Sequence, residues 1–397
     1  MGLFFVAFLL KSAKIKRKPG SAVLKQGAQR IQARGRRGSK ENTVMNFQIS
    51  NKIAGIKPSA IREILKLSAD PNIIAFSAGN PAPQAFPVEE IRRWSAEILE
   101  QEPVLALQYS VSEGYPPLRE ALEEFLQKRY GIAKEGNQII VTTGAEQGLD
   151  LICKVLCNEG DQVLCESPSF VGALNTFRSY NAKLVGVEME ADGVNTEHME
   201  RLLQTNPRIK FMYLIPNFQN PTGITMSLEK RKKVLELSAK YNVPVVEDNP
   251  YGDLRFAGED VPSIKALDTT GSVIYCGSFS KVLSPGMRVG YLCAPQKLTP
   301  SLAVAKQCTD VHTAMLPQLI CHRFLTQLDF ESHIARCRSI YGEKYHLMAR
   351  CIGEEFSQKV QVTTPQGGLF LWCTLPKGQD VMAFAQKALA QGVAIVP

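Results

Sequence analysis

Lys281 stands among hydroxyl and glycine residues in a segment that runs from Ser278 to Arg288. Apolar stretches at 272–276 and 289–293 flank it, so we expect a loop at the end of a buried strand, where ligands of open α/β sheets gather. Burial there would lower the pKa of the lysine and leave a neutral amine that can act as a nucleophile. Ser278 and Arg288 could bind a dianionic phosphate beside it. This motif alone is more typical of a surface lysine in a turn.

Two further segments place polar side chains directly after expected strands. Asn220 follows the strand expected at 210–214 and lies in an Asn-Pro-Thr-Gly turn, and Asp248 and Tyr251 follow the strand expected at 243–247. The acid could keep a ring nitrogen protonated, and Asn220 and Tyr251 could donate hydrogen bonds to a phenolic oxygen. Each residue alone is equally explained as a turn asparagine or a capping aspartate.

A third kind of site is expected where a strand leads into a helix. The segment Thr143–Gln147 follows the strand expected at 138–142, and backbone N–H groups at a helix start attract phosphate. Ala145 and Glu146 would supply these groups, although the carboxyl group of Glu146 is an awkward neighbour for a phosphate. Phe170 follows the next strand and could stack on a flat ring, but a core position explains a lone phenylalanine better.

The elements that must position these residues alternate between strand and helix from about residue 138. Near-continuous apolar strands between amphipathic helices predict a parallel sheet that is covered on both faces. We therefore predict an α/β fold in which a large lobe holds a mainly parallel seven-stranded sheet between helices. The expected strands are 138–142, 162–166, 183–187, 210–214, 243–247, 272–276 and 289–293, and the expected helices are 145–157, 172–180, 199–204 and 228–241.

After residue 326 the pattern changes and predicts a second, smaller α+β lobe. The expected elements are a long helix at 330–355, a strand at 368–374, a helix at 380–390 and a strand at 392–396. Because the chain stops on this last strand, we expect the natural sequence to continue beyond Pro397.

The formal net charge of +8 belongs to one end of the chain. Residues 1–44 hold 11 of the 46 Lys/Arg residues but one of the 38 acids, which leaves 35 basic and 37 acidic residues for the rest. The body is therefore nearly neutral, and we do not expect it to bind nucleic acid. An apolar run at 3–10 precedes the charges, the reverse of a secretory signal, so we interpret 1–44 as a disordered extension. No apolar stretch reaches the length of a membrane-spanning helix.

The ten cysteines lie mostly inside apolar runs, and the sequence contains no Cys-x-x-Cys pair. This pattern favours reduced thiols in a cytoplasmic protein over a disulfide framework or a zinc site. We therefore expect no metal centre.

The polar motifs occur in a fixed order, each after an expected strand. In this the chain resembles the fold-type I pyridoxal-phosphate enzymes of the class I/II aminotransferase group. It is most similar to the branch of 2-aminoadipate, kynurenine and aromatic or branched-chain aminotransferases. The resemblance runs from about Ile53 to the end and rests on the segments 76–81, 107–119, 213–223, 247–251 and 277–290. It implies pyridoxal 5'-phosphate as the cofactor and a small lobe made from both chain ends.

The resemblance implies a role for each matching residue. Lys281 would bind the cofactor covalently and then move a proton, while Asp248 would pair with the ring nitrogen and make the ring an electron sink. Asn220 and Tyr251 would bind the ring oxygen. The remaining cofactor contacts, mostly to the phosphate, would come from Ser278, Ser280, Arg288 and the backbone amides of Ala145 and Glu146.

Three further positions complete the implied site. Phe170 would stack on the ring, where the family often has tyrosine, and Gly79 and Asn220 would line the substrate side. Tyr109 would reach the phosphate of a neighbouring subunit, which implies a homodimer with shared active sites. In this family an arginine beyond the present end of the chain binds the substrate's α-carboxylate, so that contact is not assigned here.

The implied activity is an aminotransferase that works in two half-reactions (ping-pong). An L-amino acid of the aromatic, 2-aminoadipate or branched-chain type would give its amino group to a 2-oxo acid such as 2-oxoglutarate. One alternative is a lyase, because the fold does not fix which bond at the α-carbon breaks. Another is a MocR-type transcription regulator, although residues 1–44 are too short for its winged helix-turn-helix. The expected divisions are an extension (1–44), an N-terminal arm with part of the small domain (45–100), a large cofactor-binding domain (101–326) and a small C-terminal domain (327–397).

Overall fold

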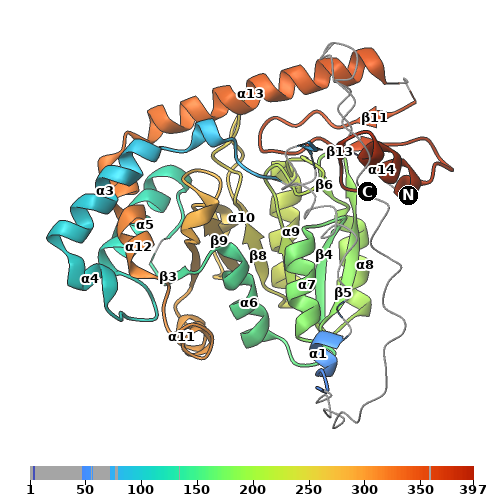
Figure 1. Cartoon of the computed structure of the whole chain (residues 1–397). Coiled ribbons are helices and arrows are strands. Elements are labelled where there is room, and N and C mark those ends of the chain that lie inside the picture. Colours follow the sequence, from blue (N-terminus) through green and yellow to red (C-terminus); the bar gives the residue numbers. More distant parts are fainter. Residues whose placement is uncertain are drawn as a thin grey trace, which may run out of the picture.

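A computed structural model describes residues 3–4, 47–54, 56, 72–76, 79–133, 135–356 and 359–397. Its main feature is one large sheet (Figure 1), in which five neighbouring strands are parallel and β10 runs antiparallel to both of its neighbours. The strand order is β3 (Asn137–Thr142), β10 (Gly290–Pro295), β9 (Val273–Ser278), β8 (Val245–Asp248), β7 (Ile209–Leu214), β4 (Gln162–Ser167), β5 (Lys183–Glu190) and β6 (Gly193–Val194). The predicted α/β sheet is confirmed, and the two-residue β6 at its edge adds an eighth strand to the seven predicted.

Helices cover both faces of this sheet because successive side chains of each strand point to opposite sides. In β7, Phe211 and Tyr213 pack in the core beneath one layer, whereas Met212 and Leu214 pack beneath the other. The first layer consists of α6 (Ala145–Leu156), α7 (Val171–Ser179) and α11 (Thr299–Gln307), and the second of α8 (Thr196–Thr205), α9 (Leu228–Tyr241) and α10 (Ile264–Leu267). A strand covered on both faces must be apolar throughout, which explains the near-continuous apolar runs.

A third core packs the β3 edge of the sheet against helices that precede the sheet in the sequence and helices that follow it. Trp94 and Leu118 pack there with Tyr275, Phe279 and Phe324. The elements of this region are α3 (Val88–Gln101), α4 (Pro103–Leu107), α5 (Pro116–Tyr130), the short 3₁₀ turn η2 (Pro285–Met287) and α12 (Met315–Gln327). The 3₁₀ turn η1 (Pro83–Ala85) packs with Cys337 and Tyr341 instead, and α1 (Asn51–Ala54) lies apart from them.

Capping chemistry sets several helix ends. The helix predicted at 228–241 is confirmed as α9. The hydroxyl group of Ser227 begins it by accepting a hydrogen bond from the amide of Lys230, and Asn242 ends it in a left-handed conformation (φ 53°). The predicted helix at 330–355 is confirmed as α13 (Phe330–Glu355), which Asp329 caps. In the described ranges, no helix is long and apolar enough to cross a membrane.

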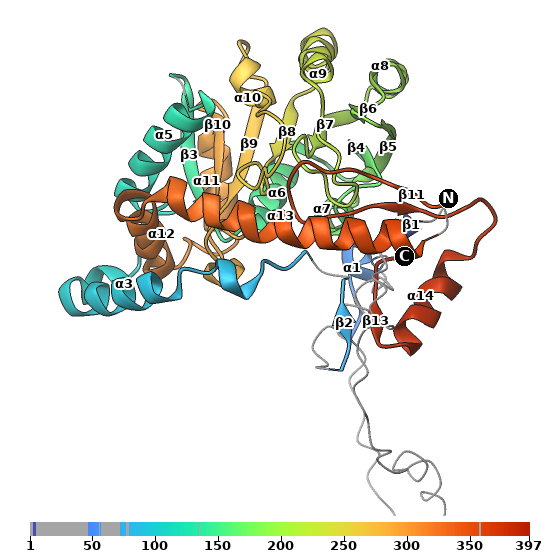
Figure 2. The same ribbon diagram turned by 90° about the horizontal axis from the view of Figure 1, so that it is seen from above.

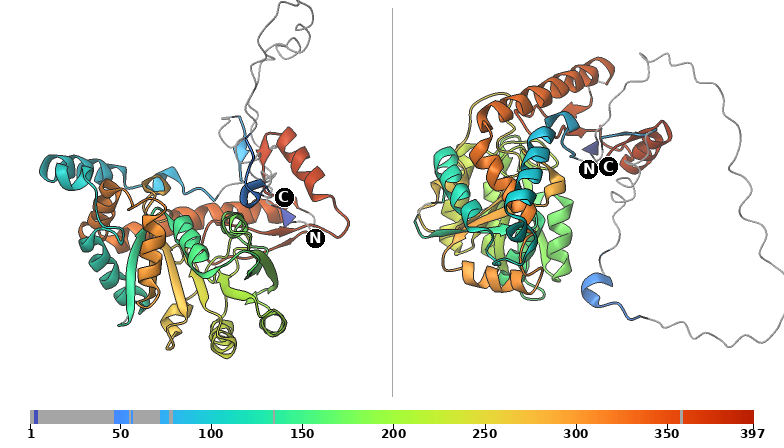
Figure 3. Two further views of the ribbon diagram at one scale, coloured as in Figure 1. Left: turned by 90° about the horizontal axis from the view of Figure 1, so that it is seen from below. Right: turned by 60° about the vertical axis from the view of Figure 1, so that its left-hand side comes forward.

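The smaller lobe draws on both ends of the chain. Strand β2 (Ile74–Ala75) pairs in parallel with β13 (Val393–Ala394), so segments more than 300 residues apart lie side by side, as Figures 2 and 3 show. α13 runs from the large lobe to this region (Figure 2). The other elements are β1 (Leu3–Phe4), β11 (Gln361–Val362), β12 (Cys373–Thr374) and α14 (Val381–Ala390).

Two predicted strands of the small lobe are shorter than expected. The strand predicted at 368–374 is limited to Cys373–Thr374, and the one predicted at 392–396 to Val393–Ala394. Gly368 has φ +75°, and a methyl group built on it would lie 2.5 Å from Phe218, so tight packing against the large lobe holds this backbone outside any sheet. The extension predicted at 1–44 lies outside the described residues except for β1, which pairs with β12.

Candidate active site

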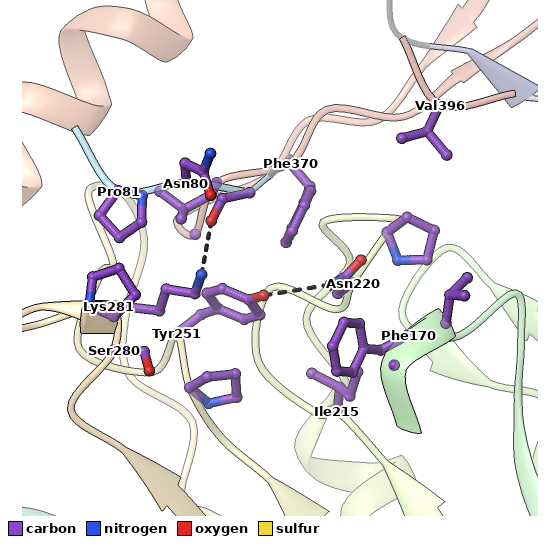
Figure 4. Close-up of a pocket in the computed structure, with 18 of the residues that line it drawn as sticks. Asn80, Pro81, Phe170, Ile215, Asn220, Tyr251, Ser280, Lys281, Phe370 and Val396 are labelled. Carbon is purple, nitrogen blue, oxygen red and sulfur yellow. Dashed lines mark hydrogen bonds between the residues drawn. The ribbon is translucent and has the colours of Figure 1, made fainter. Parts of the chain in front are cut away.

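A cavity of about 1420 Å³ opens at the carboxyl ends of the parallel strands, between the large lobe and α13. The segments around Ala145, Phe170, Asn220, Asp248 and Lys281 reach it from loops that follow strands of the large sheet, because parallel strands end at the same edge of a sheet. Figure 4 shows side chains from several of these loops facing one another across this space. The predicted site residues that line it are Gly79, Ala145, Glu146, Phe170, Asn220, Asp248, Tyr251, Ser278, Ser280, Lys281 and Arg288.

Lys281 follows β9, and its amine points into the cavity (Figure 4). Nζ donates a hydrogen bond to the carbonyl oxygen of Gly79 at 2.7 Å and lies 6.0 Å from the centre of the Tyr251 ring. Burial, together with the nearby positive charge of Arg288, lowers the pKa of Lys281 to about 8. A substantial fraction of this amine is therefore neutral near physiological pH, as a nucleophile requires.

Asp248 ends β8 and is buried, with 3% of its surface exposed. Burial raises the pKa of Asp248 to about 7, although a hydrogen bond from Tyr213 opposes the shift. The Tyr213 hydroxyl group donates to Oδ2 at 2.7 Å, and Oδ1 is buried without a hydrogen-bond partner in the described residues. A buried acceptor of this kind is costly unless a donor meets it. The protonated ring nitrogen of the expected cofactor is such a donor, so the cofactor fits here.

Asn220 and Tyr251 form a hydrogen-bonded pair beside the Lys281 amine (Figure 4). Nδ2 of Asn220 donates to the Tyr251 hydroxyl group at 3.4 Å, and Tyr251 is 4% exposed. Gln219 holds the asparagine turn in place: its amide nitrogen donates to Oε2 of Glu166 at 3.0 Å, and its amide oxygen accepts from the hydroxyl group of Thr222 at 2.7 Å. Two polar groups are thus presented to the cavity from a fixed backbone.

A cradle for an anion is formed where β3 meets α6. A methyl group built on Gly144 (φ +77°) would lie 2.4 Å from Nη2 of Arg288, and one built on Gly290 would lie 2.6 Å from the amide nitrogen of Ala145. These glycines let a guanidinium group approach the first turn of α6, and both features favour a bound phosphate. The carboxyl group of Glu146 accepts a hydrogen bond from Thr176 of α7. Burial raises the pKa of Glu146, which weakens its repulsion of an anion.

Aromatic rings form the walls of the cavity. Phe170 caps the start of α7 and lies close over Gly172, where a methyl group would be 2.4 Å from its ring. Phe370 meets the ring of Tyr251 edge-on at 5.4 Å and also covers Gly79, where a methyl group would be 2.6 Å from Phe370. A flat ring could therefore lie against Phe170, whereas the Phe370 ring leaves no room for a side chain at Gly79.

Tyr109 is the one predicted site residue that does not line the cavity. It is 82% exposed, and its ring meets that of His312 edge-on at 5.8 Å. A role across a subunit boundary stays a prediction.

Sequence reasoning missed two residues of the site. Tyr213 reads as one more apolar position of a buried strand, and nothing in the pattern 209–214 distinguishes a tyrosine whose hydroxyl group meets an acid. Phe370 lies within the stretch predicted as a strand, which hid its place in the cavity wall. The alternation of strand residues between two faces does place Tyr213 on the α6 side, and that was the available signal.

Comparisons with known proteins agree with this geometry. The family model for aminotransferase class I and II matches residues 71–397. Aromatic-amino-acid aminotransferase 1 of Thermococcus litoralis is 40% identical over 88% of this chain and 84% of its own length. The 2-aminoadipate transaminase of Thermus thermophilus is 40% identical over 86% and 85%, respectively. A crystal structure of Pyrococcus horikoshii kynurenine aminotransferase, described in complex with PMP, superimposes with a TM-score of 0.85 at 39% identity, over 88% of this chain and 87% of that one.

These matches do not favour a lyase or a transcription regulator. The chain aligns with most of the length of relatives that are named as aminotransferases, and pyridoxal phosphate is the cofactor. The chain therefore belongs to the class I and II aminotransferases: it is a fold-type I, pyridoxal-phosphate-dependent aminotransferase of the branch that includes aromatic, 2-aminoadipate and kynurenine aminotransferases.

Proposed function

We propose that Lys281 holds the cofactor covalently and moves the proton at the substrate's α-carbon. The observation that carries this proposal is the convergence of the Lys281 amine and the unpartnered Oδ1 of Asp248 on one cavity. When bound, pyridoxal phosphate supplies an electron sink for the carbanion at that carbon. Asp248 accepts a hydrogen bond from the ring nitrogen and keeps it protonated. The neutral form of Lys281, favoured by burial, takes the proton.

The other site residues bind and orient. Asn220 and Tyr251 donate hydrogen bonds to the ring oxygen, and Phe170 stacks on the ring. Arg288 binds the phosphate through its planar fork, with further contacts from Ser278, Ser280 and the amides of Ala145 and Glu146. Gly79 and Asn220 leave room for the substrate.

The amino donor that fits best is an aromatic or other long L-amino acid, with 2-oxoglutarate as the acceptor in the second half-reaction. Around the substrate side, the cavity is lined by large rings and flexible apolar side chains: Phe256, Tyr341, Tyr345, Met348, Phe370 and Trp372. Burial of an aromatic side chain against such walls is strongly favourable. The relatives named for aromatic amino acids, kynurenine and 2-aminoadipate support this class of donor.

A homodimer with shared sites accounts for the exposed position of Tyr109. Its neighbours on and after α4 are also exposed and apolar: Val104 and Leu107 are each 74% exposed, and Val111 is 51% exposed. Several large apolar side chains exposed along one short segment are typical of a protein interface. Across the interface, Tyr109 would donate to the partner's phosphate.

None of the ten cysteines forms a disulfide, which supports a place in the reducing cytoplasm.

Trapping the covalent link tests the assignment of Lys281. Borohydride reduction of the holoenzyme, followed by peptide mass mapping, should place the pyridoxyl group on Lys281. Lys281→Ala should lose both the adduct and transamination of phenylalanine with 2-oxoglutarate. Lys344 also lines the cavity, so Lys344→Ala is a matched control that should keep the adduct. Full turnover by Lys281→Ala, or an adduct on Lys344, would show that the proposal is wrong.

A further inference from the structure

A buried polar cluster lies behind the turn that leads into α6, outside the cavity. Its centre is Lys306 of α11, whose side chain is fully buried. Nζ donates hydrogen bonds to Gln147 Oε1 at 2.7 Å, to Thr313 Oγ1 at 3.0 Å, and to Asp310 at 2.9 and 3.1 Å. No step of the proposed transamination uses this amine, so the cluster needs its own explanation.

An apolar side chain of similar length would pack α11 at lower cost. A buried ammonium group is unfavourable unless it is paired and fully hydrogen-bonded. Asp310 supplies the opposite charge: burial opposes its ionisation, but hydrogen bonds from Thr143, Lys306 and Gln147 lower its pKa below the usual range. Asp310 is therefore the ionised partner of the Lys306 amine, although burial lowers the pKa of Lys306 as well. The hydrogen bonds of this pair fix the groups that they contact.

The backbone that this pair fixes is the start of the anion cradle. The amide of Thr143 donates to Gln147 Oε1 at 2.7 Å, and its hydroxyl group donates to Asp310 Oδ2 at 2.6 Å. Gln147 itself donates to the same Asp310 oxygen at 2.6 Å. The carbonyl oxygen of Thr143 accepts from Arg288 at 3.4 Å. The two residues after Gly144, at the start of α6, line the cavity.

Strain next to the cluster shows how firmly it is held. Val311 has φ +66°, which is rare for a β-branched residue, and it is 49% exposed, so its own packing does not compensate. A strained backbone of this kind persists where contacts on both sides hold it in place. Here Lys306 binds Asp310 before Val311 and Thr313 after it.

We propose that Lys306 and Asp310 are positioning residues that preorganise the turn at Thr143 for the phosphate of the cofactor. With the turn fixed in advance, the amides at the start of α6 and the guanidinium group of Arg288 receive the anion without reordering the backbone. Lys306 lies outside the cavity lining, so the effect falls on anion affinity and not on proton transfer. The inference rests on the proposed phosphate site.

The test measures binding of pyridoxal phosphate, and of inorganic phosphate alone, to the apoenzymes of the wild type, Lys306→Met and the nearly isosteric Asp310→Asn. Loss of hydrogen bonds to a charged group should weaken both ligands roughly ten- to a hundredfold. At saturating cofactor, kcat should stay within about threefold of the wild type, because Lys281 and Asp248 are untouched. The ³¹P chemical shift of the bound cofactor should also change.

Lys154→Met is the matched control. Lys154 of α6 reaches the turn after α11 through a 3.1 Å hydrogen bond to Thr309, but it is exposed and outside the cluster, so its removal should leave phosphate affinity unchanged. Wild-type affinity for both anions in either cluster variant, with a folded apoenzyme by circular dichroism, would overturn the inference. Equal weakening in Lys154→Met would also overturn it. Should the wild type itself give no borohydride adduct at Lys281, the proposed function fails instead, independently of these affinities.

Discussion

The hydroxyl group of Tyr213 donates to Oδ2 of Asp248 at 2.7 Å, and both side chains are buried. The tyrosine comes from β7 and the aspartate from β8, which are parallel neighbours in the sheet. One carboxylate oxygen is thereby fixed, and the other is left for a donor in the cavity. This bond orients the acid and favours its ionised form, against the effect of burial.

We expect Tyr213→Phe to reduce kcat about tenfold, the usual effect of losing a hydrogen bond to a charged group. The bond lowers the pKa of Asp248, so its loss should raise that pKa further and move the acid limb of the kcat profile to higher pH. Tyr180→Phe is the control, because its hydroxyl group donates to Asp150 at 2.9 Å between α7 and α6. An unchanged acid limb in Tyr213→Phe would contradict the assignment.

The lowered pKa of Lys281 predicts how the apoenzyme takes up its cofactor. The neutral, reactive fraction of the amine grows as the pH rises through about 8, so the rate of covalent uptake should rise over the same range. An ordinary lysine would show this rise only near pH 10.4. Stopped-flow absorbance at fixed pyridoxal phosphate follows the reaction directly. A rise confined to pH values above 10 would mean that burial does not control this amine.

Gly79 is expected to set the room available to the substrate. A methyl group there would lie 2.6 Å from the Phe370 ring, so Gly79→Ala should push this ring into the cavity and lower kcat/KM for aromatic donors roughly tenfold. The second change Phe370→Leu should restore part of the loss. Gly353→Ala on α13 meets nothing within 4 Å and serves as the control. Equal losses for alanine and phenylalanine as donors would argue against a steric cause.

Mixing two damaged enzymes tests whether Tyr109 acts across an interface. In a heterodimer of Lys281→Ala and Tyr109→Ala subunits, one of the two sites combines an intact lysine with the partner's intact tyrosine. Activity after denaturation and refolding together should therefore exceed the sum of the separately refolded variants. Sedimentation velocity should show that Leu107→Glu, within the exposed apolar patch, dissociates the dimer. Strictly additive activity would place Tyr109 in its own subunit's site or in none.

The sequence predicts the site well where chemistry and strand order coincide. Lys281, Asp248 and Asn220 each follow a buried strand, and parallel strands bring such positions to one edge, so their convergence on one cavity could be anticipated. The bounds of α9 and α13 could be anticipated for a similar reason, since caps and apolar spacing agree locally.

The remaining features depend on contacts between distant segments. Periodicity places Tyr213 on one face of the sheet, but it does not predict that its hydroxyl group donates to Asp248 on the neighbouring strand. The strand predicted at 368–374 failed because Gly368 packs against Phe218, 150 residues away, and its backbone adopts a positive φ. Tertiary packing overrides local propensity in such places.

The close approach of Arg288 to Gly144 gives the strictest test of the anion cradle. Gly144 has φ +77° and ψ 164°, a region that is essentially restricted to glycine, and a methyl group there would lie 2.4 Å from Nη2 of Arg288. Gly144→Ala should therefore displace the guanidinium group and weaken pyridoxal phosphate binding by more than about tenfold, because a charged contact to the phosphate is lost. Equilibrium titration of the apoenzyme measures this change.

A substitution at Gly131 is the control that distinguishes the effect of backbone strain from the loss of the anion cradle. It ends α5 with φ +66°, and a methyl group there meets nothing within 4 Å. Gly131→Ala should cost about 1–2 kcal/mol of folding stability through its left-handed backbone while leaving cofactor affinity intact. Because strain alone lowers Tm in both variants, only Gly144→Ala should also lose affinity for the cofactor. If Gly131→Ala weakened binding as much, global destabilisation would explain the effect, and the cradle would not.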